Sequence, residues 1–280
     1  MRLREENSKR MLSAAKARSE MDPVQKAFAL LALALTIMAI SATVVFASTR
    51  KPNYQPNASE LEQNFMEIAL KHEYGRNSNV RLLRWERPIK MNIIFGASVD
   101  QAHRHETTSS VRKLTRELSQ LSGVPISVTN QPGNFFVVVA DAHSLARMGP
   151  YLKKTVPGIS SRSVSRITNR PRHFRCMVVG VPFQDKSMGY RSAVAIIPAG
   201  LPAEKREACI QEEISQGLGL PNDFKSNTAT VFNDDEKYLS LTPLDKLLVR
   251  TLYDRRLKSG MQSKAVTPVL KQICNDLVQR

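Results

Sequence analysis

Apolar and polar positions divide the chain into one long apolar segment and a larger region with helical and strand periodicity. The apolar segment, residues 27–48, has 22 residues without a charge and consists mainly of Leu, Ala, Ile and Val. At about 1.5 Å per helical residue it would extend roughly 33 Å, enough to cross the hydrocarbon core of a bilayer. We therefore predict a single transmembrane helix here, since a buried soluble helix would need apolar surroundings on every side.

Charges around the apolar segment predict its orientation. Seven Lys and Arg residues precede it in residues 1–26, whereas only Arg50 and Lys51 occur in the 20 residues that follow. By the positive-inside rule, residues 1–26 form a cytoplasmic tail and the chain beyond residue 48 lies on the other side of the membrane. We favour a retained anchor, because the apolar run exceeds the roughly 7–15 residues of a signal-peptide core. Cleavage as a signal peptide stays an alternative, since small residues flank Phe46 near the end of the run.

Beyond a short linker, residues 49–58, the pattern predicts one exported α+β domain over residues 59–280. Helices are expected at 59–74, 107–121, 202–218, 242–253 and 263–277, and strands at 91–95, 126–129, 135–140, 176–181 and 192–197. Ser59 and Glu62 predict a capping box at the start of the first helix. The last two strands are expected to form a hairpin, and residues 144–172 are ambiguous between short helical turns and loop.

The chain is strongly basic, with 41 Lys and Arg against 25 Asp and Glu and a pI near 10.0. Without the cytoplasmic tail, 34 basic and 21 acidic residues remain, so the predicted exported region is basic as well. An exported region does not meet chromosomal DNA, and we predict no nucleic-acid partner. A cell-envelope component is expected instead: an anionic lipid, a cell-wall polymer or a protein. A basic surface that only aids solubility is the alternative.

Cysteine usage agrees with export to a compartment that permits disulfides. Cys176 opens a predicted strand, and Cys209 lies in the helix that follows the next strand. A bridge between them would close a loop of roughly 34 residues and contribute on the order of 3–4 kcal/mol to stability. Cys274 is the remaining cysteine, and we expect it to be buried.

The segment 209–223 carries the residues that point to chemistry. Glu212 and Gln216 are four residues apart on one predicted helix, so their side chains share a face, and Glu213 is rotated by about 100° from Glu212. Gly219 permits a sharp turn that would return Asn222 or Asp223 towards them. An ordinary amphipathic helix, with its apolar residues inward and these polar residues outward, is the alternative from spacing alone.

This segment resembles the zinc-binding motif HExxHxxGxxH/D of the metzincin metallopeptidases. The resemblance places Glu212, Gln216 and Asn222 at the three zinc-ligand positions, Glu213 at the general-base position and Gly219 at the turn glycine. The stretch 230–233 resembles the Met-turn of that family, with Phe232 in place of the methionine, and the helix 242–253 resembles its closing helix. The resemblance implies a zincin-like domain with a mixed β-sheet and an active-site-type helix.

A closer similarity is to a family of uncharacterised proteobacterial envelope proteins, many of them lipoproteins. The similarity extends over about residues 80–280 and is most specific between Cys209 and Met261, where CIxEExxQxLGLxND, VFNDD and LTxxDxLLxRxLYDxRLxxGM occur nearly in full. Membership implies an envelope location and a fold but no established activity.

The departure from the metzincin motif argues against a zinc peptidase, because both helical histidines are replaced. A carboxylate with two amide oxygens suits a harder cation better than zinc, so we expect no zinc cofactor and leave open another divalent metal. His103 and His105 are expected at the surface and do not replace the missing ligands. Two functions follow: a catalytically degenerate zincin-like domain that binds an envelope partner, or a hydrolase with an atypical site in which Glu213 is the general base.

Overall fold

Strands β3 (Phe135–Ala140) and β5 (Tyr190–Pro198) place apolar side chains on both faces of the central sheet. In this computed structural model, Phe135 and Val137 of β3 belong to the hydrophobic core on one face, and Phe136 and Val138 belong to the core on the other. Because successive side chains of a strand point to opposite faces, a strand covered on both sides is apolar at every position. This explains the uninterrupted apolar run of β3.

The structure describes residues 55–71, 80–171, 175–224, 228–233 and 237–279, all within one compact unit, Asn53–Arg280. The predicted cytoplasmic tail 1–26, the predicted transmembrane segment 27–48 and most of the predicted linker lie outside these residues. Within the described part of the chain, no helix combines the length and apolar character needed to cross a bilayer.

The sheet has five strands in the order β2-β1-β3-β5-β4. Strands β1 (Ile89–Phe95), β2 (Ile126–Val128), β3 and β5 are parallel, whereas β4 (Met177–Pro182) pairs antiparallel with β5. The predicted hairpin between the last two strands is therefore confirmed. Among the described residues, β4 pairs with a strand on one side only, so its other edge is a free edge of this sheet.

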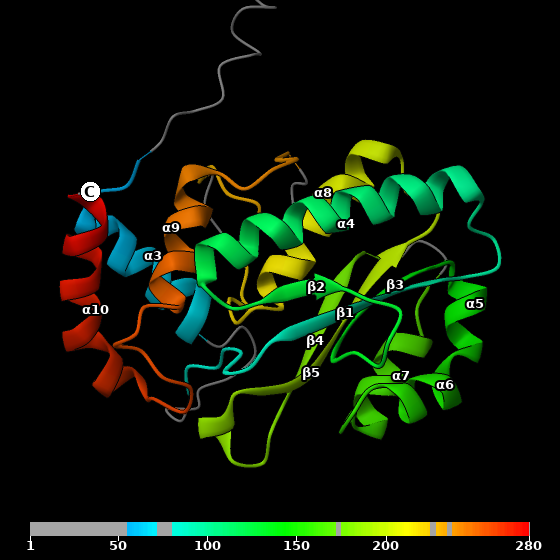
Figure 1. Ribbon diagram of the computed structural model, residues 1–280, viewed down its shortest axis with the longest axis horizontal. Helices are drawn as coiled ribbons and strands as arrows, with labels where there is room; N and C mark the ends of the chain where they lie inside the picture. Colours follow the sequence, from blue (N-terminus) through cyan, green and yellow to red (C-terminus); the bar gives the residue numbers. More distant parts are fainter. Residues whose placement is uncertain (1–54, 72–79, 172–174, 225–227, 234–236, 280) are drawn as a thin grey trace, which may run out of the picture. The chain divides into compact units, whose positions relative to one another are not determined.

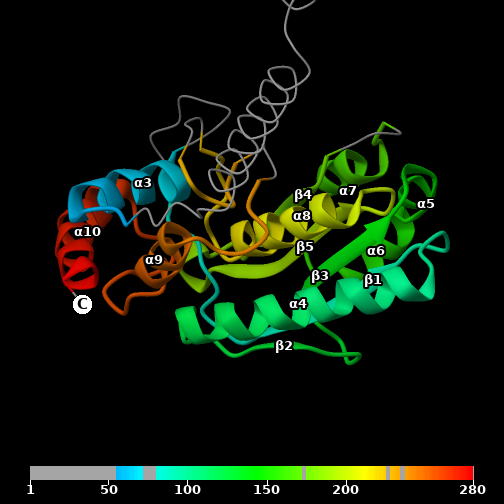
Figure 2. The same cartoon turned by 90° about the horizontal axis from the view of Figure 1, so that it is seen from above.

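Helices cover both faces of the sheet (Figures 1 and 2). The long helix α4 and helix α8 pack on one face, the short helices α5, α6 and α7 pack on the other, and α3, α9 and α10 contact one another on the α8 side. Their bounds are α3 Ala58–Leu70, α4 Gln101–Ser122, α5 Ala142–Arg147, α6 Gly149–Thr155, α7 Ser161–Thr168, α8 Ala203–Gln216, α9 Pro243–Leu252 and α10 Ser263–Val278. The arrangement is the α+β fold expected from the sequence.

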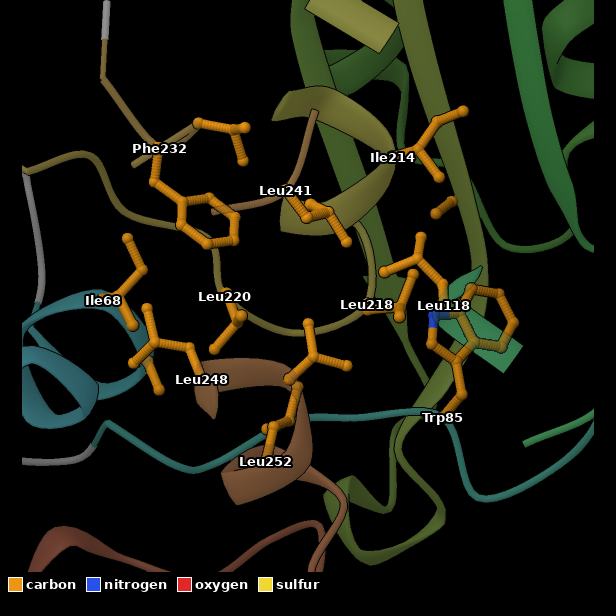
Figure 3. Packing of buried hydrophobic residues seen from close by; sticks show 14 of the residues in the cluster. Ile68, Trp85, Leu118, Ile214, Leu218, Leu220, Phe232, Leu241, Leu248 and Leu252 are labelled. Carbon is orange, nitrogen blue, oxygen red and sulfur yellow. The ribbon is translucent and has the colours of Figure 1, made fainter. Parts of the chain in front are cut away.

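The larger core lies between the sheet and helices α3, α4, α8, α9 and α10. Figure 3 shows Trp85, Leu118 and Leu218 at one end of this core and Phe232 with Ile68 and Leu220 at the other. The indole N–H of Trp85 donates to the carbonyl of Gly217 at 2.9 Å, which satisfies the only polar atom of this buried side chain. The core thereby fixes the end of α8 against the segment that precedes β1.

Several predicted boundaries are wrong, and the cause is local capping. The N-cap of helix α3 is Asn57, two residues before the predicted N-cap Ser59. Asn57 and Glu60, not Ser59 and Glu62, form the reciprocal hydrogen bonds of the capping box. Helix α4 begins at Gln101 instead of residue 107, because the Asp100 carboxylate accepts a hydrogen bond from the His103 N–H and caps the helix there. Residues 144–172, whose pattern fits either short helical turns or loop, contain most of α5 and all of α6 and α7.

The predicted disulfide between Cys176 and Cys209 is confirmed, with its Cα atoms 5.9 Å apart. It links the residue before β4 to the middle of α8, and so connects the edge of the sheet to the helix beside it. Cys274 is free and buried, as expected.

A buried carboxylate links the loop around residues 228–233 to the start of α9. Asp245 has no exposed surface, and its oxygens accept hydrogen bonds from the Thr230 hydroxyl at 2.5 Å and from the N–H groups of Val231 and Thr242 at 3.2 and 2.7 Å. Burial raises the pKa of Asp245 to about 6, although these hydrogen bonds oppose the shift. The folded domain therefore binds a proton on Asp245 more tightly than the unfolded chain does.

The raised pKa of Asp245 predicts a specific pH dependence of stability. Between the ordinary value of 3.8 and about 6, protonation favours the folded state, so this group contributes stability at low pH that is lost as pH rises through about 6. The contribution is on the order of 3 kcal/mol. We expect urea unfolding at pH 4 to 7 to show this decline in the native chain and a flatter profile in D245N; parallel profiles would contradict it.

Removing the disulfide should lower stability through the unfolded state. We expect C176A/C209A to lose about 3 kcal/mol of unfolding free energy, because the unfolded chain gains the freedom of a loop that spans 33 residues in sequence. Guanidinium unfolding measures this loss. A dithiol reductant should bring the native chain to the same midpoint and leave the double variant unchanged; a reductant effect on the double variant would show that the bridge is not responsible.

Candidate functional site

A cleft of about 700 Å³ lies between helix α8 and the edge strand β4. Glu212, Glu213 and Gln216 of α8 line it, and so do the turn residues Gly219, Asn222 and Asp223, which follow the helix. The opposite side is formed by the start of β4, and the remaining lining residues are Ala69, Lys71, Val80, Arg81, Leu83, Arg166, Arg170, Lys186, Tyr190 and Pro221. The cleft therefore contains the residues of the 209–223 segment that were selected from their spacing.

Helix α8 places its polar residues in the cleft because its apolar residues enter the core. Ile210 and Ile214 are buried in the larger core, whereas Glu212, Glu213 and Gln216 line the cleft with exposed fractions of 5%, 4% and 7%. Helix α8 is therefore amphipathic, and its polar face is the face that lines the cleft.

Gly219 makes the turn that returns the chain to the cleft. Its φ of 131° is a conformation that side chains other than glycine rarely adopt, and a Cβ there would lie 2.1 Å from the Leu83 carbonyl oxygen. Glycine is therefore the residue that this backbone conformation and this close contact favour. The turn positions Asn222 and Asp223 next to α3 and α8.

Asn222 and Asp223 have different partners after this turn. The Asn222 side-chain amide donates to the Ile68 carbonyl at 2.9 Å, and its backbone N–H donates to the same carbonyl at 3.2 Å. These bonds satisfy an end carbonyl of α3, where helical partners are missing. The Gln216 amide donates to the Asp223 carboxylate at 2.6 Å, so Asp223 is hydrogen-bonded to a side chain of α8.

The donor set in the cleft does not fit zinc. One ligand atom each from Cys176, Glu212 and Glu213 lie within 4.8 Å of one another. The Cys176 sulfur is held in the disulfide, so it offers no thiolate, and two carboxylates remain. Structural and catalytic zinc sites rely on imidazole and thiolate ligands, and neither is supplied by the described residues of this cleft.

Cations of the neighbouring elements shape the electrostatics of the cleft. Burial and the nearby Arg166 lower the pKa of Arg170, and the carboxylate of Glu213 opposes that shift. Arg170 is therefore an electrostatic partner of Glu213. Tyr190 also lines the cleft. Burial raises the pKa of Tyr190 to about 12, so its phenol stays neutral at physiological pH.

Other residues selected from the sequence lie away from the cleft. Phe232, at the position of the methionine in the Met-turn comparison, is fully buried in the larger core. His103 and His105 lie in the first turns of α4, where His105 is exposed and His103 is half-buried, and neither lines the cleft.

Sequence reasoning missed the cationic wall of the cleft, which includes Arg166 and Arg170. Both belong to the stretch 144–172, for which periodicity was ambiguous. One signal was present: residues 142–184 contain eight Lys and Arg and no Asp or Glu. A stretch that contains basic but no acidic residues predicts a cationic surface, although not its place in the fold.

Comparison with known proteins gives the chain a family. A search of curated proteins finds no match. The family model described as protein of unknown function (DUF2927) matches residues 58–272, which agrees with the expected membership of an uncharacterised family and begins earlier than residue 80. It includes α3, the whole sheet, the cleft and most of α10. On this match, the chain belongs to the DUF2927 family.

Proposed function

We propose that this domain is a non-catalytic binding module of the bacterial cell envelope, which holds an extended segment of a protein partner in the cleft beside β4. The observation that carries the proposal is the position of the cleft along the free edge of the sheet. Cys176, just before β4, and Met177, Val178 and Gly180 of β4 line the cleft at this edge.

An edge strand can pair with an added strand because alternate backbone groups point away from the sheet. The side chains of β4 divide between the two faces: Val178 packs against the larger core, whereas Met177 and Val179 pack against the smaller one. Gly180 is exposed, and its missing Cβ makes room for the Tyr190 ring, which a Cβ would approach to 2.5 Å. The edge opposite β5 is thus bordered by a cleft large enough for peptide side chains.

The polar residues of α8 support binding rather than metal-dependent hydrolysis. The Gln216 amide and the Asp223 carboxylate bond to each other, and the Asn222 amide bonds to α3. Glu213 has a cationic neighbour in Arg170. These interactions hold the side chains to neighbouring parts of the protein, and the described residues of the cleft supply neither imidazole nor thiolate as a zinc ligand.

A degenerate zincin-like ancestry is part of the proposal. It is supported by the chain order of α8, the Gly219 turn, the loop that contains Phe232 and helix α9, together with the mixed sheet. The proposed location is the periplasmic side of the inner membrane, with residues 27–48 as the anchor. That location is supported by the charge asymmetry around the apolar segment and by the disulfide.

The alternative function is hydrolysis with Glu213 as general base. Glu213 lines the cleft close to Glu212, so a substrate in the cleft would lie near two carboxylates. Such a site would need a metal other than zinc, or none, to activate water.

Metal content and cleavage distinguish the two functions. We expect the purified full chain to hold substoichiometric zinc, calcium and manganese by mass spectrometry, and to cleave casein no faster than E213Q. The double variant E212H/Q216H should gain zinc, because it places two imidazoles four residues apart on the cleft face of α8. Stoichiometric metal in the native chain, with cleavage that is lost in E213Q, would support the hydrolase and contradict the binding module.

Backbone-methylated peptides test the strand pairing. A fluorescein-labelled ten-residue peptide of alternating Val and Gln should bind the full chain. Methylation of alternate backbone nitrogens in one register should weaken binding more than about tenfold, because two or more hydrogen bonds of about 1 kcal/mol each are lost. Methylation in the other register should have little effect, because those nitrogens point away from β4. Fluorescence anisotropy measures both, and equal effects of the two registers would contradict strand addition.

A further inference from the structure

The charges of the cleft are separated by position. Among the described residues that line it, the carboxylates Glu212, Glu213 and Asp223 belong to α8 and the turn after it, and the two glutamates are almost fully buried. Its cations come from other elements and lie around the opening: Lys71, Arg81, Arg166, Arg170 and Lys186. All of these cations except the half-buried Arg170 are exposed. A ligand at the opening therefore meets mainly positive charge.

The interactions of these cations offset only part of the positive charge that lines the cleft. Lys71 is paired with Glu67 at 2.9 Å, which reduces its contribution. Arg81 donates to the Gly260 carbonyl, which carries no net charge, and the carboxylate of Glu213 acts electrostatically on Arg170. Arg166 and Lys186 lie on α7 and at the turn between β4 and β5, so cations are present near both ends of β4.

The residues around β4 add to the positive electrostatic potential at the cleft. The segment 142–184, which forms α5, α6, α7 and β4, has no acidic residue, so no carboxylate of its own offsets the cations along this wall. Exposed Arg147, Lys153, Lys154 and Arg162 extend the positive charge over the helices behind the sheet edge. Like charges would repel a basic segment from this side, whereas an acidic segment would be attracted.

We propose, on the basis of the strand-binding function proposed above, that the segment bound beside β4 is acidic. Its backbone pairs with the free edge of β4, and its carboxylates, at alternate positions, face the cations at the cleft opening. Selection against basic partners follows from the same cations, because a lysine-rich strand would bring like charges together.

Three matched peptides test this inference on the purified full chain. They share the ten-residue alternating design and carry Glu, Gln or Lys at every second position. We expect the Glu peptide to bind about tenfold more tightly than the Gln peptide, because several exposed charge pairs form with the cations of the cleft. We expect the Lys peptide to bind most weakly. The advantage of the Glu peptide should decrease between about 0.05 M and about 0.5 M NaCl, because salt screens exposed charges.

Charge-removing variants locate the effect. R166Q/K186Q should reduce the preference for the Glu peptide over the Gln peptide about threefold or more. R162Q is the matched control, since Arg162 is exposed on the same helix as Arg166 but does not line the cleft, and we expect it to keep the preference. An equal loss in R162Q would place the effect outside the cleft and overturn the inference.

The outcomes distinguish the acidic preference from the strand-binding function on which it rests. Equal binding of all three peptides, with the register-specific effect of backbone methylation intact, would overturn the acidic preference and leave strand binding standing. Failure of all three peptides to bind would overturn strand binding and the acidic preference with it.

Discussion

Apolar side chains on both faces of β3 and β5 require helices on both sides of the sheet, and most of the structure depends on this constraint. Helices α4 and α8 cover one face, and α5, α6 and α7 cover the other (Figure 1). Both central strands are then enclosed, and the free edges belong to β2 and β4. Because α8 lies next to the β4 edge and is bonded to it through the disulfide, the cleft is a direct result of how the sheet is buried.

Polar groups are retained on the buried side of this cleft although apolar residues would be easier to bury. A carboxylate removed from water destabilises the fold unless cations or hydrogen-bond donors compensate for the lost hydration. Here Arg170 lies near Glu213, and Gln216 bonds to Asp223. Side chains held in this way are more easily explained by a function at the cleft than by stability.

A carboxylate and an amide, from Glu212 and Gln216, line the cleft where they share one face of α8. The amide nitrogen of Gln216 donates to the Asp223 carboxylate, and this hydrogen bond holds the turn after α8 against the helix. What remains open to a partner is the backbone of β4 and the cations around it. These are features of recognition, in which backbone pairing provides affinity and charge provides selectivity.

The sequence by itself determined the strands, the helices α8, α9 and α10, the α+β class, the disulfide pair and the shared face of Glu212 and Gln216. These features depend on periodicity, on local caps and on the chemistry of residues near in sequence. Element starts that depended on competing caps, as at Asp100, were misplaced, because several residues could have accepted the same hydrogen bonds.

Only the tertiary structure decided that β4 lies at an edge, that Asn222 bonds to the end of α3 and that Arg170 stands beside Glu213. Each of these contacts joins elements that are far apart in the chain. Local patterns carry no information about which distant surfaces meet, because that is decided by how the apolar faces of all the elements are buried together.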